Sequence, residues 1–320
     1  MAAQPYHQQF DSQETQLNKE PILLENYPVP LSPPLPLISK DIELNRAMSA
    51  SSKSSLFTIN KSDVLFEDEW LIAFNKPQGV YCETILASVP TLLLNNSTEL
   101  GTQAKKMELH LANRLDRDTS GVILITKSHK VAAKLVKAFT DHKVRKTYIA
   151  FCVGQRPKWK KMTLKSGHGR SKFGAWRVYA AKDVGRKLPG GSSVKHMETL
   201  FEVLSINGEE CTKEMSELNV VVEDKSLIEF DCEANKVEIL VRAYPRSGRT
   251  HQIRLHCQYL GIPVRGDVKY EGVYEWNETV YDGHELHAES LTFDHPVTGS
   301  SVVIHAPLPS WANKGLALAL

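Results

Sequence analysis

A carboxylate flanked by arginines is the part of this sequence best suited to chemistry. Asp116 lies between Arg114 and Arg117, and the polar run 119–121 separates it from the apolar stretch 122–125. Turn-forming residues followed by a β-branched run predict a loop that leads into a buried strand. A carboxylate on a loop that a rigid scaffold positions is better suited to catalysis than to packing. We therefore take Asp116 as the candidate nucleophile.

The Asp116-x-Asp118 pair is compatible with other roles. Either side chain could cap a turn through its own backbone. An EF-hand loop that began at Asp116 would need a Glu at its twelfth position, which holds Lys127, so calcium is not expected. A magnesium-dependent phosphotransferase of the haloacid dehalogenase kind would place its first Asp after a long apolar strand, whereas the stretch before Asp116 is mixed and basic. That alternative stays open.

Four segments resemble, in order, the motifs of the RluA-type RNA pseudouridine synthases. The run 114–121 is similar to the family's catalytic motif Arg-Leu-Asp-x-x-Thr-Ser-Gly. The others resemble the opening motif, the tyrosine motif and the C-terminal signature, and they are 64–79, 145–150, and 247–256 with 261–267 and 286–288. Together the matches frame residues from about 62 to 308.

The resemblance implies a fold and a reaction. The fold is α+β, with a curved, mixed and largely antiparallel sheet flanked by helices and an active-site cleft across the sheet. The reaction isomerises specific uridines of ribosomal or transfer RNA: the N1–C1′ bond breaks, C5 joins C1′ and the C5 proton leaves. It requires no cofactor and no metal. A carboxylate can attack or stabilise an electron-poor sugar carbon, which is the role that the resemblance implies for Asp116.

Two further residues match the family's active site. Arg254 corresponds to the arginine beside the aspartate, and a guanidinium would keep Asp116 ionised in a buried site. Tyr148 corresponds to the active-site tyrosine, which could stack on a flipped pyrimidine and accept a proton. Without the resemblance, Tyr148 would be taken for a half-buried strand residue. A non-catalytic RNA-binding or chaperone protein of the same fold remains an alternative function.

The charge distribution also indicates an RNA partner. The net charge is only +2, but the stretch 143–187 holds 14 basic residues and a single acid, with aromatic residues among them. Such a stretch provides phosphate neutralisation and stacking surfaces.

Many family members carry His where this chain has Asn113. The residues that we expect to contact substrate or RNA are Lys76, Asn113, Arg114, Lys146, Arg170, Lys172, Trp176, Arg177, Arg249 and His251.

Hydrophobic patterning predicts the elements that position these residues. The expected strands are 71–74, 122–126, 147–153, 199–204, 237–243 and 302–305. The expected helices are 130–141 and 250–259, the second capped by Thr250. That helix would carry His251 and Arg254 on one face, because they are three residues apart.

Composition indicates how the chain is organised. Residues 1–60 are biased toward Pro, Ser and Gln, which favours a disordered or extended segment. Residues 61–320 would form the catalytic domain, with a basic insertion at 155–190 and an acidic insertion at 205–236 that we expect to be a loop facing away from RNA.

Five dispersed cysteines argue against a zinc site or a disulfide framework. No apolar run approaches the ~20 residues that span a bilayer. We expect a monomer in the cytoplasm, without a membrane partner.

Overall fold

The computed structural model describes residues 26–37, 39–54, 56–95, 108–210, 216–223 and 235–317. Within these ranges, thirteen strands form one sheet with the main order β1-β2-β4-β14-β5-β11-β8-β6-β10. The strands of this path are β1 Val64–Glu67, β2 Leu71–Lys76, β4 Ser120–Thr126, β5 Arg145–Gly154, β6 Trp159–Arg170, β8 Lys195–Ile206, β10 Ser216–Val221, β11 Val237–Pro245 and β14 Leu286–Asp294.

Four short strands extend this sheet, and a separate hairpin lies outside it. The additional strands are β3 His110–Leu111 on β4, β7 Trp176–Tyr179 on β6, β9 Glu209–Glu210 on β8 and β15 Ser301–His305 on β14. The hairpin consists of β12 Glu275–Trp276 and β13 Thr279–Val280. Strand pairing in the large sheet is antiparallel except between β14 and β4 and between β10 and β6.

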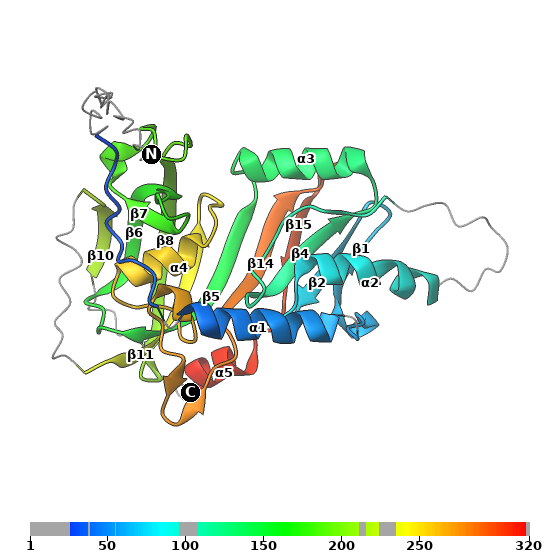
Figure 1. Ribbon diagram of the computed structural model, residues 1–320. Coiled ribbons are helices and arrows are strands. Elements are labelled where there is room, and N and C mark those ends of the chain that lie inside the picture. The colour runs from blue at the N-terminus through cyan, green and yellow to red at the C-terminus, as the bar shows by residue number, and fades with distance from the viewer. Residues whose placement is uncertain are drawn as a thin grey trace, which may run out of the picture.

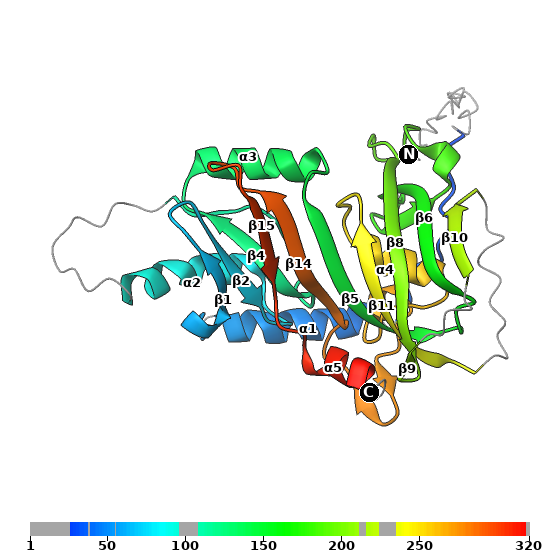
Figure 2. The same ribbon diagram turned by 180° about the vertical axis from the view of Figure 1, so that it is seen from behind.

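Helices pack on both faces of the sheet. They are α1 Ser39–Ser54, α2 Cys82–Asn95, α3 His129–Thr140, α4 Gln252–Tyr259 and α5 Ser310–Ala317. Figures 1 and 2 show α1, α2 and α4 on one side of the sheet. This arrangement confirms the predicted α+β fold with a mixed, largely antiparallel sheet. Among the helices of the described ranges, none has the length and apolar character needed to cross a membrane.

The central strands are buried on both faces. Leu71, Ala73 and Val122 pack in a cluster with α3, whereas the alternate residues Ile72 and Ile123 pack in a cluster with α2. Strands covered on both sides read as continuous apolar runs, which is why the patterning located β2 and β4. All six predicted strands are present, and each extends further than predicted.

The helix α4 begins differently from the prediction. Thr250 was expected to cap it, but the N-cap position belongs to His251, in the left-handed conformation with φ of 57° and without a side-chain cap hydrogen bond. The Thr250 carbonyl instead accepts a hydrogen bond from His168. A left-handed non-glycine residue is strained, and at this position the His251 Nε2 atom lies 3.7 Å from Asp116 Oδ1.

The N-terminal segment is more ordered than its composition suggested. Residues 1–25 lie outside the described ranges, but α1 occupies 39–54, so the prediction of a disordered or extended segment is wrong there. The part before α1 does run extended: the Leu31 amide donates to the Val178 carbonyl at 2.8 Å, and Ser32 Oγ accepts from the Val178 amide at 3.0 Å. Tertiary contacts rather than local periodicity hold this segment.

The two insertions contribute strands to the end of the sheet. The basic insertion contains the antiparallel pair β6 and β7. The acidic insertion was expected to be a loop, but its residues 216–221 form the edge strand β10, which pairs with β6 in parallel. Residues 211–215 and 224–234 of this insertion lie outside the described ranges.

Candidate active site

Asp116 lies in the short loop that connects β3 to β4. The Thr119 amide donates to the Asp116 carbonyl at 3.1 Å, which closes a turn just before β4 begins. Gly121 has a φ of 106°, and a Cβ at this position would lie 2.2 Å from the Ala288 carbonyl oxygen on β14. Only glycine fits this close approach, so the glycine at the end of the motif lets the loop enter the sheet beside β14.

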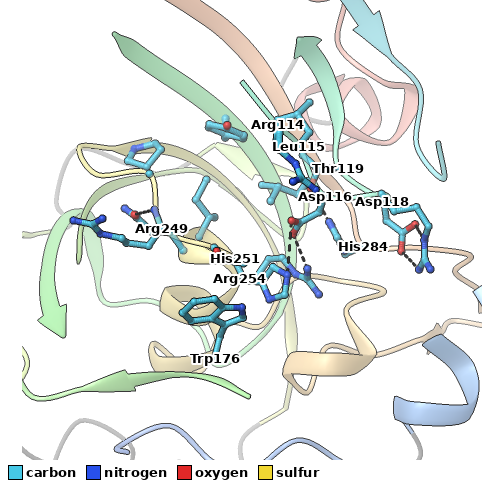
Figure 3. A pocket seen from close by; sticks show the side chains of 18 of the residues that line it. Arg114, Leu115, Asp116, Asp118, Thr119, Trp176, Arg249, His251, Arg254 and His284 are labelled. Atoms are coloured by element: carbon cyan, nitrogen blue, oxygen red, sulfur yellow. Dashed lines mark hydrogen bonds and ion pairs between the residues drawn. The ribbon is translucent and has the colours of Figure 1, made fainter. Parts of the chain in front are cut away.

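Arg254 on α4 bridges two carboxylates. Its Nη1 donates to Asp116 Oδ2 at 2.7 Å, while its Nε and Nη2 donate to Asp267 at 2.6 and 2.8 Å. Asp267 and Arg254 are buried, with 0% and 4% of their side chains exposed, whereas Asp116 keeps 30% exposed. The planar guanidinium therefore fixes Asp116 from a buried anchor and leaves its carboxylate open to the cleft (Figure 3).

This ion pair decides the charge of Asp116. Burial alone would raise the pKa of Asp116, but the adjacent Arg254 charge and its hydrogen bond bring the pKa well below the ordinary value. Burial, followed by the charge of Arg254, lowers the pKa of His251 to about 3 and that of His284 to about 4. At neutral pH the site therefore holds an ionised carboxylate between neutral imidazoles.

His251 faces the other oxygen of the Asp116 carboxylate. Its Nδ1 is 2.7 Å from the Tyr270 hydroxyl, and its Nε2 is 3.7 Å from Asp116 Oδ1. The second distance exceeds a hydrogen bond, whereas Arg254 binds Oδ2 directly. Oδ1 is thus the oxygen that Arg254 does not hold, and it is the better candidate for attack on an electron-poor carbon.

Tyr148 lies on β5, in register with Ala288 of β14 and Ala243 of β11, and lines the same cavity as Asp116. Burial, with the nearby Asp116 charge, raises the pKa of Tyr148 well above its ordinary value. The phenol is therefore protonated at neutral pH. Its ring is available for stacking, whereas a protonated phenol is a poor proton acceptor.

Asp116, Tyr148, His251 and Arg254 all line one cavity of about 690 Å³. Its wall comes from the catalytic loop, β5, α4 and the β6–β7 hairpin. Six of the residues predicted to contact substrate or RNA line it, namely Arg114, Lys146, Arg170, Trp176, Arg249 and His251. Figure 3 shows Arg249 and Trp176 on the α4 side of the carboxylate and Arg114 on the opposite side.

Aromatic and cationic groups meet at the β6–β7 wall. The Arg170 guanidinium lies 4.7 Å from the Trp176 ring centre, and the His168 ring stacks on Trp176 at the same separation. On the neighbouring wall, Lys146 Nζ donates to the Ser247 carbonyl at 2.8 Å, and burial together with Arg249 lowers the pKa of Lys146 to about 8. This combination suits phosphate and base contacts.

The other four predicted contacts do not line this cavity. Lys76 is fully buried, and its Nζ donates to the carbonyls of Pro77, Val80 and Arg117 at 2.9, 2.7 and 2.8 Å. It therefore supports the catalytic loop from behind, and its enclosed ammonium is not presented to the cavity. A lysine beside a turn gave no signal that its ammonium would be enclosed by carbonyls.

Asn113 likewise serves the loop. Its Oδ1 accepts from the Leu124 amide at 2.7 Å and its Nδ2 donates to the Val122 carbonyl at 3.3 Å. Both bonds tie the loop to β4, and a contact of Asn113 with the substrate stays a prediction. At the position where many family members carry histidine, Asn113 therefore uses its side-chain amide to hydrogen-bond the backbone of β4.

Lys172 and Arg177 do not line the cavity either. Lys172 Nζ lies 4.9 Å from the ring centre of Phe173, in the turn between β6 and β7. Arg177 Nε donates to Ser32 Oγ at 3.0 Å, which joins β7 to the N-terminal segment. A contact of either side chain with RNA outside this cavity stays a prediction.

Two important residues were missed by the motif analysis. Asp267 is the last residue of the matched segment 261–267, so a carboxylate in the same C-terminal signature as Arg254 was a signal for this second anchor. His284 gave no such signal; its Nε2 is 2.7 Å from Thr119 Oγ1, so it holds the far end of the catalytic turn.

The two aspartates of the loop do not converge on a shared site. Asp118 receives two hydrogen bonds from Arg117 at 2.6 and 2.7 Å, while Asp116 pairs with Arg254. Within the described ranges, no group of three or more His, Cys, Asp or Glu side chains could hold a metal ion. Because each carboxylate has its own arginine, this geometry disfavours the magnesium-dependent phosphotransferase alternative.

Comparisons with known proteins point to the same chemistry. The model of a family described as RNA pseudouridylate synthase matches residues 70–259. RNA pseudouridine synthase 1 of Arabidopsis thaliana is 63% identical over 292 residues, covering 90% of this chain and 87% of that protein. Ribosomal large subunit pseudouridine synthase C of Pasteurella multocida is 30% identical over 267 residues, covering 82% and 70%.

A solved structure supports the fold. Human RNA Pseudouridylate Synthase Domain Containing 1 superposes with a TM-score of 0.52 at 20% identity, covering 79% of this chain and 87% of that one. The family match extends over the catalytic loop, Tyr148 and Arg254, which are the residues that the geometry assembles. The chain therefore belongs to the RluA-type RNA pseudouridine synthases, a family of isomerases.

Proposed function

We propose that this protein isomerises uridine to pseudouridine in ribosomal or transfer RNA, with Asp116 as the nucleophile. The observation that carries the proposal is the ionised, partly exposed Asp116 carboxylate, which the buried Arg254–Asp267 pair holds in a cation-lined cleft. Arg254 stabilises the anion and orients Asp116, so that Oδ1 is free to approach the ribose.

The reaction balances without an external reagent. The N1–C1′ bond breaks and its electron pair leaves with the uracil, while Asp116 bonds to C1′ or stabilises its positive charge. The uracil then turns, C5 bonds to C1′ and any bond to Asp116 breaks. C5 loses one proton and N1 gains one, so the product is an isomer of the substrate.

The target base must leave its stack to reach Asp116. The carboxylate lies inside a cavity of about 690 Å³, which a base inside a duplex cannot enter. We place the flipped uracil against Tyr148, and the flanking phosphates near Lys146, Arg170 and Arg249. The raised pKa of Tyr148 favours stacking as its main role, with proton acceptance as the second candidate.

The test compares the wild type with Asp116→Asn. Each protein is incubated in chelator with unmodified transcripts of ribosomal and transfer RNAs, and pseudouridine is mapped at single-nucleotide resolution. We expect product from the wild type and none from Asp116→Asn, which keeps the shape of the side chain but lacks the nucleophilic charge. The exposed Asp294→Asn is the matched control and should match the wild type.

The main alternative predicts a different result. A non-catalytic RNA-binding or chaperone protein would bind the same transcripts, measured by filter binding, without forming pseudouridine. Equal product from the wild type and Asp116→Asn would show that Asp116 is not the nucleophile.

A further inference from the structure

We propose that helix α1 is part of the active site and that Arg46 and Glu43 are positioning residues for the catalytic loop. The proposal rests on the proposed function, because its effect is read as pseudouridine formation. No motif predicted a role for α1, because it lies in the stretch expected to be disordered or extended, outside every family motif and before the family match at residues 70–259.

The N-terminal segment connects the two halves of the molecule that form the cleft. Figure 1 shows the chain descending beside the β6–β7 hairpin and α4 and then continuing as α1 toward β1 and β2. At the first end, Leu31 and Leu35 pack against the cluster that contains Leu255 and Tyr259 of α4. The segment therefore contacts the element that carries Arg254 before it reaches the catalytic loop.

Arg46 attaches α1 to the segment that follows α4. Its Nη1 donates to the Gly266 carbonyl at 2.9 Å and its Nη2 to the Tyr281 carbonyl at 2.5 Å, with only 10% of the side chain exposed. Gly266 immediately precedes Asp267, the buried anchor of Arg254. Arg46 is thus linked to Asp116 through the backbone of Gly266 and Asp267 and then through the Asp267–Arg254 and Arg254–Asp116 hydrogen bonds.

Glu43 contacts the catalytic loop from the same helix. Its Oε2 is 3.6 Å from Arg117 Nη2 and 4.0 Å from Lys269 Nζ, and its side chain lines the cavity of Asp116. Arg117 in turn binds Asp118 within the loop. Glu43 therefore lies between the catalytic loop and the segment 266–284, the two parts that Arg254 joins.

These contacts give α1 a positional effect on the reaction. The segment 266–284 carries Asp267, Tyr270 and His284, which contact Arg254, His251 and Thr119 respectively. Without Arg46, two of its carbonyls lose a charged donor. A shift of the segment would move the guanidinium that orients Asp116, and a misplacement of about 1 Å can slow a reaction about 100-fold.

The experiment uses full-length variants and the transcript that the wild type modifies. Uridine tritiated at C5 reports the reaction, because this proton leaves when C5 bonds to C1′. Single-turnover rates at saturating enzyme separate the chemical step from RNA binding. Arg46→Ala should lower the rate at least about tenfold, with little change in the enzyme concentration that gives half of the maximal rate. Arg46→Lys should recover part of the lost rate. Glu43→Gln should lower it about threefold.

Lys40→Ala is the matched control, because Lys40 is an exposed cation on the same helix. Its rate should equal that of the wild type. All rates are measured well below the melting temperature of each variant, so that a loss of folded protein does not count as a loss of rate. A wild-type rate for Arg46→Ala would overturn the proposal.

Hydrogen–deuterium exchange provides a readout that does not depend on activity. The segment contains backbone hydrogen bonds from Gly272 to Asp267 and from Tyr281 to Tyr274, both at 2.8 Å. Arg46→Ala should speed exchange at these amides and Lys40→Ala should not; unchanged exchange would contradict the role of Arg46. If the wild type forms no pseudouridine, the proposed function fails, and exchange still decides whether α1 holds this segment.

Discussion

At the scale of single residues, the site depends on one guanidinium that serves two carboxylates. Arg254 uses Nε and Nη2 for Asp267 and Nη1 for Asp116. A lysine ammonium has no such planar fork. The buried Asp267 compensates the charge of Arg254 and fixes its plane, so the remaining N–H group points at Asp116. The arrangement explains how a carboxylate in a cavity remains ionised and correctly oriented.

The role of Tyr148 can be resolved by removing its hydroxyl alone. Because its pKa is raised, we expect the ring to matter more than the phenol oxygen. Tyr148→Phe should keep the single-turnover rate within about tenfold of the wild type, since loss of an acid–base group costs about 100-fold or more. Tyr148→Ala removes the stacking surface and should be far slower. A rate for Phe as low as that for Ala would assign proton transfer to the hydroxyl.

Lys146 should make RNA binding sensitive to alkaline pH. Burial, with Arg249 nearby, lowers its pKa to about 8, so the ammonium is charged below pH 8 and loses its proton above it. Losing one charged phosphate contact costs about 1.5 kcal/mol, or about tenfold in affinity. The half-saturation concentration should therefore rise between pH 7 and 9.

Lys146→Arg is the control for this titration, since arginine keeps its charge throughout the range. Its affinity should change less with pH than that of the wild type on the same RNA. Equal pH dependence in the two proteins would show that another group causes it.

At the scale of elements, the β6–β7 hairpin provides the stacking wall of the cleft. Trp176 packs with Arg170 and His168 rather than with the Asp116–Arg254 pair. Trp176→Ala should weaken RNA binding about tenfold, which lies within the usual value of a base–aromatic stack, and leave the rate at saturation unchanged. Phe173→Ala in the same hairpin is the control, because Phe173 is 84% exposed and does not line the cavity. A comparable loss from both variants would contradict a specific role for Trp176.

The sequence predicted those strands and helices whose hydrophobic pattern is visible in their own residues. The strands β2 and β4 are apolar on both faces, and α3 shows helical periodicity, so local patterns were sufficient. The site residues Asp116, Tyr148 and Arg254 were located by motif resemblance, and the structure places all three in one cavity.

Elements held by distant contacts could not be predicted in this way. Helix α1 depends on the carbonyls of Gly266 and Tyr281, more than 200 residues away along the chain. The capture of Lys76 by three carbonyls and of Asn113 by β4 also follows from tertiary geometry. Residue type and spacing do not distinguish such buried polar groups from groups that contact RNA.

At the scale of the whole molecule, RNA attraction must be local. The net charge of +2 is too small for a strong overall field. Several cations of the cleft are already paired with carboxylates, such as Arg117 with Asp118 and Arg254 with Asp267. Lys146, Arg170 and Arg249 remain the best candidates for phosphates. Arg249 keeps its orientation by donating from Nε to the His196 carbonyl at 3.0 Å.

The salt dependence of binding should therefore identify the cleft as the RNA site. Each phosphate contact to single-stranded RNA contributes about 0.7 to the slope of log affinity against log salt. Arg170→Ala and Arg249→Ala should each reduce the slope by about that amount, and the double variant by about 1.4. Arg156→Ala removes an exposed cation of the same basic insertion that does not line the cavity, and should leave the slope unchanged. If Arg156→Ala reduces the slope as much as Arg170→Ala, the phosphates are bound diffusely over the insertion and not in the cleft.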